Sequence, residues 1–419
     1  MKMIALLAIR NLRRNRVRTG LSIGGIAVAS LLLIFNLGFI DGFYTMMIRG
    51  STEVEIGHIQ VQHRDYVDRP TTLDYLEYDT ALVEALAGSH FIEAFAPRIR
   101  LMGLVGHEER SQVGRIFGVH PEQEASVTVM KRGITEGRWL QGEYNPEEVA
   151  EVVIGRGLAR SLGISLGDEL VVIAEGADGS MGDALLEVVG IVQTGNSAVD
   201  RTIAIVHLEE AQFIGAMEGV VHEIVIRVNN PSDAIPLARQ LQRTLEGQGR
   251  GELLARPWQE VNRSLYELLQ LGNQSNYIIF LVIAFIVSLG VLNALRMSAR
   301  ERMREFGVLL ALGMPRIRLF GMVLLEGLIL GAMGAFVGGL LGGLMTYYFS
   351  RKGLDFGAFV EGEATYMGVS FSDRIFFGFS PEMIIAPALG LMFVTMLCAL
   401  WPAVWSIRLD PKNSISGRQ

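Results

Sequence analysis

Long apolar runs occur four times along the 419-residue chain, and each is long enough to form a membrane-spanning helix. We predict these helices at 20–43, 277–295, 319–350 and 383–407. The uncharged part of the first run, 20–40, has 21 residues and reaches about 31 Å as a helix, which matches the hydrocarbon core of a bilayer. The third run is longer, so we expect that helix to tilt or to extend beyond the bilayer.

A cleavable signal peptide is the alternative interpretation of the first run. Its apolar stretch is too long for a signal peptide, and the residues that follow it, Asp41-Gly42-Phe43-Tyr44, offer no small-residue cleavage site. We therefore interpret the first run as an uncleaved membrane anchor.

Segment 44–276, between the first two runs, shows the mixed pattern of an α/β domain. Residues 57–63 alternate between apolar and polar positions, as a strand does. Short apolar runs between turn signals predict further strands at 112–119, 152–154, 170–174 and 185–192. Residues 176–180, rich in Gly and Asp, predict the tip of a hairpin between the last two strands. Helical spacing predicts helices at 73–86 and 231–246.

Residues 257–276 have a helical pattern that leads directly into the second apolar run. We predict that this pattern forms a stalk helix at the end of the α/β domain. Because no flexible linker interrupts it, such a helix would transmit movement between the domain and the membrane.

The charges are distributed unevenly along a chain that is 50% hydrophobic and has a mean hydropathy of +0.34. Segments 1–19, 296–318 and 408–419 together carry 15 basic and three acidic residues, whereas 44–276 carries 19 basic and 34 acidic residues. Basic segments stay in the cytoplasm, so we place both termini and 296–318 there. Segment 44–276 and the loop 351–382 are then outside. We expect 1–19 to form a basic amphipathic helix and 408–419 to be a cytoplasmic tail.

The sequence does not suggest catalysis or nucleic-acid binding. It has no G-x-x-x-x-G-K-[ST] phosphate loop and no H-E-x-x-H or C-x-x-C motif. Cys398 is the sole cysteine, so the chain cannot form an internal disulfide. His58 and His63 would face opposite sides of one strand, which disfavours a shared metal ion. The basic residues flank membrane spans, where anionic lipid explains them, and the large domain is acidic. We expect no catalytic residues, no metal, no cofactor and no nucleic-acid partner.

Two features near the third run suggest a function in the membrane. Glu326 is a carboxylate within an apolar span, so it either has a functional gating role or is paired with a nearby arginine. Segment 296–318 is predicted to be a short amphipathic helix, which either lies on the membrane surface or docks to a cytoplasmic partner. Glycines at 331–343 recur at a spacing that permits close helix packing in lipid.

Segment 301–314 (ERMREFGVLLALGM), followed by 324–327 (LLEG), resembles the permease domain of the FtsX/MacB/Lol class of ABC transporters. That family has an R-x-x-E-[IF]-G-[VI]-L-+-A-L-G segment before a span that carries a Glu, and here Leu310 replaces the basic residue. The ending with Pro402-Ala403 and Leu409-Asp410-Pro411 is also similar to that of the family. Further similarities to the periplasmic core domain of this family lie at 133–140 (GITEGRWL), 153–159 (VIGRGLA) and 166–170 (LGDEL).

The resemblance implies an integral membrane fold of four transmembrane α-helices. A large α/β periplasmic domain, Porter plus Sabre-like, is inserted between the first two. It implies a pair of permeases, the second being a copy or a paralogue, driven by a separate cytoplasmic ABC ATPase dimer that binds the ATP. The mechanism would be mechanotransmission. The resemblance assigns ATPase coupling to Arg302, Glu305, Gly307 and Gly313, and Glu326 corresponds to the intramembrane Glu of the family.

Within this class, four spans, about 400 residues and no fused ATPase best resemble the lipoprotein-releasing permeases of the inner membrane. We therefore expect release of lipoproteins or another amphipathic substrate from the outer leaflet. The alternatives are export of peptides or small amphiphiles and a signalling scaffold for a periplasmic partner. Apolar residues of the first two spans would line a substrate cavity: Leu31, Leu32, Phe35 and Phe280. A periplasmic carrier stays open as a partner, because 174–183 is short, acidic and Gly-rich where those permeases have a long carrier-recruiting hairpin.

Overall fold

The computed structural model describes residues 8, 10–12, 14, 16–68, 74–355, 365–366, 369–370 and 374–408. These residues divide into two compact units. The helical unit contains the described residues of 1–45, 269–355 and 374–419, and the sheet unit contains those of 46–268 and 356–373. The tail 409–419, most of 1–15 and most of the loop 356–373 therefore lie outside the described residues.

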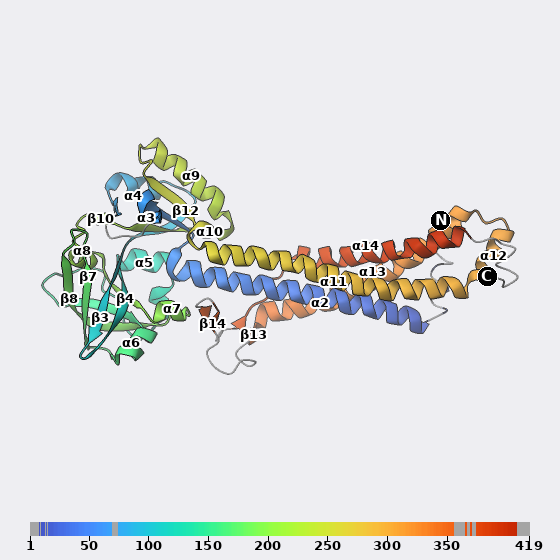
Figure 1. Ribbon diagram of the computed structural model, residues 1–419, viewed down its shortest axis with the longest axis horizontal. Helices are drawn as coiled ribbons and strands as arrows, with labels where there is room; N and C mark the ends of the chain where they lie inside the picture. Colours follow the sequence, from blue (N-terminus) through green and yellow to red (C-terminus); the bar gives the residue numbers. More distant parts are fainter. Residues whose placement is uncertain are drawn as a thin grey trace. The chain divides into compact units, whose positions relative to one another are not determined.

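Four long helices dominate the helical unit (Figure 1). They are α2 (Arg16–Ser51), α11 (Arg263–Glu301), α13 (Arg316–Lys352) and α14 (Pro381–Ile407). Each contains one of the predicted runs, and each is long and apolar enough to cross a membrane. Large apolar side chains such as Leu32, Phe285 and Phe336 are more than half exposed. Apolar exposure of this kind suits helices that face lipid or other spans.

The first two helices extend beyond the apolar runs that predicted them. After Ser51, the chain continues as a π-helical turn, η1 (Thr52–Ile56), and stops at Gly57, whose φ of +64° favours glycine. The predicted stalk pattern is confirmed from Arg263 onward, because α11 runs from there to Glu301 without a break.

The part of the pattern before Arg263 forms a separate short helix, α10 (Trp258–Val261). The Asn262 side chain accepts a hydrogen bond from the backbone N–H of Leu265 at 3.2 Å and so begins the next helix.

Glycines of α13 allow close packing against two neighbouring helices, as their spacing predicted. A Cβ at Gly338 would lie 2.4 Å from the carbonyl oxygen of Ala27 and 2.6 Å from Cβ of Ser30, both on α2. A Cβ at Gly331 would lie 2.0 Å from Oγ1 of Thr395 on α14. Any larger residue at these two glycines would therefore push the helices apart.

The prediction of one amphipathic helix over 296–318 was wrong. After α11 ends at Glu301, a separate short helix, α12 (Met303–Ala311), follows. Gly313 then adopts a φ of +89°, a conformation that ends helices, and Pro315 directly precedes α13. The Gly and Pro break the pattern because neither can continue a regular helix through this position.

The sheet unit is built on a mixed sheet that has ten strands among the described residues. These are β1 (Ile59–His63), β3 (Ile92–His107), β4 (Arg110–Val119), β5 (Ile134–Gly137), β6 (Ala150–Gly155), β7 (Glu169–Glu175), β8 (Met181–Val192), β9 (Ile203–His207), β11 (Glu223–Val228) and β12 (Leu253–Pro257). The strand order is β12-β1-β11-β3-β4-β9-β6-β8-β5, and β7 pairs with β3 and β8. Within this sheet β4–β9 and β6–β8 are parallel, and the other pairs are antiparallel.

The predicted strands and the predicted hairpin of the α/β domain are confirmed. Glu175 lies opposite Met181 across the β7–β8 hairpin, and Gly179 takes a φ of +81° at its tip. The helix predicted at 231–246 is confirmed as α9 (Ala234–Gly247), which follows a 3-10 turn. The helix predicted at 73–86 was wrong at its start, because β2 (Leu76–Glu77) precedes α4 (Thr80–Ala87).

A buried ionic cluster lies in the core of the sheet unit. The side chain of Arg98 on β3 is fully buried, and so are its partners Glu124 and Glu223. The shortest Arg98–Glu124 distance is 2.6 Å, and the Arg98–Glu223 distance is 3.3 Å. Arg98 also donates to the backbone carbonyl of Glu55 at 2.6 Å, which ties strand β3 to the turn η1.

The carboxylate of Glu55 joins the same cluster from η1. It accepts a hydrogen bond from Arg115 at 2.7 Å and another from Arg100. The guanidinium groups of Arg98, Arg100 and Arg115 lie 5.0 to 5.5 Å from the ring centroid of Phe117. The turn η1 is therefore held to strands β3 and β4 by several charge-assisted hydrogen bonds.

Candidate functional site

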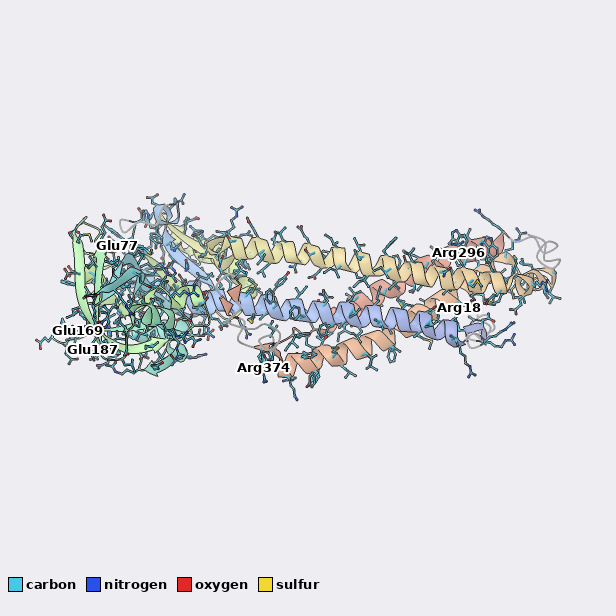
Figure 2. All side chains as sticks on the ribbon, turned by 60° about the horizontal axis from the view of Figure 1, so that its bottom comes forward. Arg18, Glu77, Glu169, Glu187, Arg296 and Arg374 are labelled. Carbon is cyan, nitrogen blue, oxygen red and sulfur yellow. The ribbon has the colours of Figure 1, made fainter. Side chains whose placement is uncertain are left out.

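Charged and polar groups gather at the end of the helical unit where α11 stops and α13 begins. Arg18 and Arg296 both lie at this end (Figure 2). The site residues predicted from the sequence, Arg302, Glu305 and Glu326, are brought together here, and Asn11 of the N-terminal segment joins them.

Glu326 lies ten residues after the start of α13, and its side chain is 5% exposed. Nη1 of Arg302 donates to both carboxylate oxygens, at 2.7 and 2.9 Å. Nδ2 of Asn11 donates to Oε1 at 2.7 Å. A buried carboxylate costs several kcal/mol unless it is paired and hydrogen-bonded, and these contacts supply that compensation. The arginine partner that the sequence suggested for Glu326 is Arg302.

Arg302 occupies the one-residue link between α11 and α12, so its side chain starts from the turn itself. Its guanidinium group lies 5.0 Å from the ring centroid of Phe306 on α12. Phe306 is 1% exposed and packs in an apolar cluster with Leu319 and Met322 of α13. The short helix α12 is therefore fixed to α13 by an ion pair and by apolar packing.

Two further ion pairs connect N-terminal residues to this turn. Glu305 on α12 pairs with Arg14 and also lies 3.5 Å from Nε of Arg302. Arg18 at the start of α2 donates to both oxygens of Glu301, at 2.6 and 2.9 Å. These side chains are partly exposed, so each pair stabilises the fold by less than about 1 kcal/mol.

The opposite face of α12 has no cover among the described residues. Arg304, Val308 and Leu312 recur every four residues, and Val308 and Leu312 are 45% and 80% exposed. A cavity of about 370 Å³ opens beside this face and is lined in part by Arg304 and Glu305. Of the two predicted coupling glycines, Gly307 is buried on α12, and Gly313 forms the turn after it.

The four residues predicted to line a substrate cavity do not converge on one place. Phe35 packs its ring against Phe377, with a centroid distance of 5.0 Å, whereas Phe280 lies against Gly390 on α14. Leu31 lies beside α13, and Leu32 is more than half exposed. A cavity formed by these residues stays a prediction.

The histidines that the sequence raised as metal ligands have other surroundings. Nδ1 of His58 lies 3.1 Å from both the backbone nitrogen and the backbone oxygen of Val228, and burial lowers the pKa of His58. His63, Asp65 and Asp74 bring one ligand atom each within 4.8 Å of one another. Asp65 is exposed, and exposed acidic groups of this kind are common without a metal.

The sequence did not reveal one partner of Glu326 in the site, nor one motif in the sheet unit. Asn11 was missed because nothing local distinguishes an amide in a basic segment as the partner of a carboxylate 315 positions away. We expected no G-x-S-x-G nucleophile motif from the sequence, and this was wrong, because residues 163–167 match it. Ser165 lies between a helix and a strand, and its backbone N–H donates to Asp168 at 2.8 Å. A nucleophile elbow lies between a strand and a helix, so the surroundings of Ser165 differ from those of that motif.

Two family models match the chain and together extend over most of it. Residues 19–244 match the MacB-like periplasmic core domain, and residues 277–411 match the FtsX-like permease C-terminal model. The first match covers more than half of the chain.

The curated relatives of the chain include lipoprotein-releasing transmembrane proteins and a macrolide export permease. The chain is 24% identical to the lipoprotein-releasing system transmembrane protein LolC of Neisseria meningitidis over 341 residues, which cover 80% of this chain and 78% of the relative. It is 23% identical to LolC of Xylella fastidiosa over 430 residues, which cover 98% and 97%. It is 21% identical to the macrolide export ATP-binding/permease protein MacB of Sodalis glossinidius, with coverage of 98% of this chain and 60% of that protein.

Proposed function

Because the chain belongs to the ABC transporter permeases of the FtsX, MacB and Lol class, we propose that it is the membrane subunit of an ATP-driven machine that extracts lipoproteins or other amphipathic substrates. The substrate would leave the outer leaflet of the inner membrane, and a separate ABC ATPase dimer would supply the energy. A second copy or a paralogue would complete the permease pair.

The observation that carries this proposal is the hydrogen-bonded network around Glu326. Arg302 starts from the turn before α12 and binds Glu326 inside α13, while Asn11 binds the same carboxylate from the N-terminal segment. A displacement of α12 is then passed to α13 and to the N-terminal segment instead of being absorbed by a loop. This arrangement suits a short helix that receives movement from a partner.

The partner would dock on the uncovered face of α12. Val308 and Leu312 present apolar side chains at helical spacing, and Arg304 adds a positive charge to the same face. A small apolar patch bordered by charge is typical of a transient protein interface. We assign this face, together with Glu305, to contact with the ATPase, in agreement with the resemblance of 301–314 to the coupling segment of the family.

We also propose the orientation in the membrane. The end of the helical unit that carries α12 is rich in arginines, and the sheet unit belongs to a strongly acidic segment. The positive-inside rule then places α12 and both termini in the cytoplasm and the sheet unit in the periplasm. In this orientation α2 and α11 leave the membrane as unbroken helices and enter the periplasmic sequence.

The apolar surfaces of α2 and α11 favour an amphipathic substrate. Leu281, Phe285 and Leu289 recur every four residues on α11 and are each more than half exposed, as is Leu32 on α2. In a pair of permeases these faces would form a lipid-accessible chamber between the two copies. Such a chamber suits acyl chains, which is why lipid-anchored substrates are favoured over soluble peptides.

Mass spectrometry of the purified complex tests this proposal. The permease is extracted in mild detergent with its ATPase, once without ATP and once after trapping with ATP. We expect acylated proteins to copurify without ATP and to be absent after trapping. If neither sample contains acylated protein and a periplasmic protein instead stimulates ATP turnover, extraction is wrong and the scaffold or exporter alternative replaces it.

A further inference from the structure

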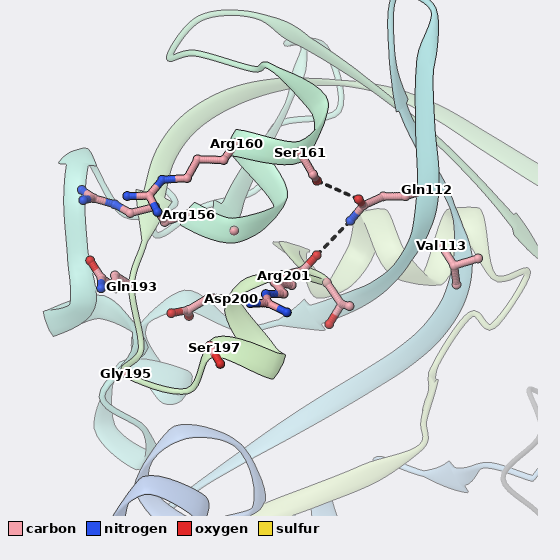
Figure 3. Close-up of a pocket in the computed structure, with 12 residues that line it drawn as sticks. Gln112, Val113, Arg156, Arg160, Ser161, Gln193, Gly195, Ser197, Asp200 and Arg201 are labelled. Carbon is pink, nitrogen blue, oxygen red and sulfur yellow. Dashed lines mark hydrogen bonds between the residues drawn. The ribbon is translucent and has the colours of Figure 1, made fainter. Parts of the chain in front are cut away.

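A cavity in the sheet unit is lined by three arginines. It has a volume of about 630 Å³ and lies between strand β4, helix α6 (Arg156–Leu162) and the turn around α7 (Ser197–Asp200) (Figure 3). Arg156 and Arg160 reach it from α6, and Arg201 reaches it from the end of α7. The volume falls in the range of small-molecule sites, which is about 300–1,000 Å³.

The local sequence Gly155-Arg156-Gly157 makes this cavity possible. A Cβ at Gly155 would lie 2.2 Å from the carbonyl oxygen of Asp200, and a Cβ at Gly157 would lie 2.8 Å from Cγ of Arg201. Any side chain at these two positions would force α6 away from α7. The glycines therefore bring the arginines of both helices to the rim of one cavity.

One wall of the cavity is held in a fixed geometry. Ser161 on α6 donates to Oε1 of Gln112 at 2.7 Å, and Nε2 of Gln112 donates to the carbonyl oxygen of Arg201 at 2.8 Å (Figure 3). The amide of Gln112 thereby joins β4, α6 and the end of α7. A wall that is already hydrogen-bonded loses little further freedom when a ligand binds.

The charges in the cavity are not balanced from within. Arg156 and Arg160 are four apart on α6, where like charges repel each other. Arg156 donates to Glu136 at 3.2 Å, but its Nε is buried without a hydrogen-bond partner. Within the described part of the chain, neither Arg160 nor Arg201 takes part in a salt bridge.

Among the described lining residues the acidic member is Asp200, which is outnumbered by the three arginines. Its side chain is largely buried, and Oδ1 accepts hydrogen bonds from the backbone N–H and the hydroxyl of Thr194, at 2.9 and 2.8 Å. The described lining therefore carries a net positive charge within a segment that has 34 acidic and 19 basic residues.

We propose that this cavity binds the phosphate group of a phosphate ester. Planar guanidinium groups bind phosphate oxygens through paired, charge-assisted hydrogen bonds, and the buried Nε of Arg156 offers a further donor. The cavity is much larger than one phosphate ion, so the ester carries an organic group, which lies beside Gln112 and the exposed side chain of Val113. A phospholipid headgroup and a soluble phosphate ester share this chemistry. The site is independent of the proposed transport function.

Calorimetric titration of the full-length chain in phosphatidylcholine nanodiscs tests the site. The probes are inorganic phosphate, glycerol 3-phosphate and acetate. The pocket variant is R160Q/R201Q, which leaves the Arg156–Glu136 pair intact. The control is R239Q/R243Q, which removes two exposed arginines of α9 that line no part of the cavity. We expect glycerol 3-phosphate to bind saturably and the pocket variant to bind about tenfold or more weakly, because charge-assisted hydrogen bonds are lost.

A second arm distinguishes the two sources of the phosphate. Each chain is first assembled in nanodiscs that also contain phosphatidylglycerol and is then transferred to nanodiscs of phosphatidylcholine. The phosphatidylglycerol that stays bound to the protein is measured for the unmodified chain and for both variants. Retention that is lost only in R160Q/R201Q identifies a lipid headgroup, whereas saturable binding of glycerol 3-phosphate identifies a soluble ester. The proposal is overturned if acetate binds as tightly as the phosphate probes. It is also overturned if the pocket variant and the control behave alike in both arms.

Discussion

Replacing Arg302 by Met would leave the carboxylate of Glu326 buried, with Asn11 as its one partner from the present network. Arg302 now supplies two hydrogen bonds to this carboxylate, whose side chain is 5% exposed. Removing one partner of a buried ion pair costs about 3–5 kcal/mol, because the remaining charge is uncompensated. We therefore expect R302M to unfold at a markedly lower temperature than the unmodified chain in the same detergent.

Removing both charges should reverse most of this loss. The double variant R302M/E326L replaces the pair by apolar side chains, an exchange that is often neutral or stabilising. The matched control is the pair Arg18–Glu301, which joins helices at the same end but is partly exposed. We expect R18M alone to cost less than about 1 kcal/mol.

The assay is thermal unfolding of the purified chain, followed by ATP-driven substrate release with the partner ATPase. If the Arg302–Glu326 pair couples α12 to α13, the double variant is stable but releases little substrate per ATP hydrolysed. Full release by the stable double variant would show that the pair has a structural role alone. An R302M variant as stable as R18M would refute the energetic argument itself.

Three further outcomes can be checked in the same preparations. E305A should hydrolyse ATP with its partner but release less substrate, whereas E267A, at an exposed carboxylate of α11, should behave like the unmodified chain. G338V should lower the free energy of unfolding by about 1–3 kcal/mol, and with it the unfolding temperature, because its Cβ meets the backbone of α2. G339V, whose Cβ meets no atom closer than 3.9 Å, should change the stability little. Burial lowers the pKa of His58 in the folded chain. Below about pH 6.5 the unfolded chain therefore binds more protons than the folded chain, so the free energy of unfolding should fall as the pH drops. H58Q should flatten this dependence in unfolding curves recorded at neutral and acidic pH.

The sequence predicted those elements whose pattern is local. Each apolar run has its helix, and the β7–β8 hairpin has its Gly-rich tip at 176–180. Strand β3 was missed because Pro97, Gly103 and Gly106 interrupt its pattern and because residues 96–99 are buried on both faces. A strand in the middle of a sheet does not show the alternation that identifies a half-buried strand.

The candidate site was predictable in its residues but not in its connections. Gly313 and Pro315 are visible breaks in the sequence, yet the amphipathic pattern across them suggested a single helix. Glu326 was recognisable as a costly charge, and a nearby arginine was an evident partner. The choice of Arg302, and the contribution of Asn11, depend on how α12 and the N-terminal segment pack against α13, which no local pattern encodes.

Ion pairs hold the start of α2 and the turn η1 that follows its other end, and the two sets of pairs differ in burial. At the start, Arg18 binds Glu301 in a partly exposed pair, which can break and re-form at little cost. At the other end, Glu55 of η1 is held by Arg100 and Arg115, and the buried Arg98 binds its backbone carbonyl. Buried, multiply bonded charges resist separation because any unpaired member is left without solvent. The turn η1 is therefore held to strands β3 and β4 more firmly than the Arg18–Glu301 pair holds the start of α2.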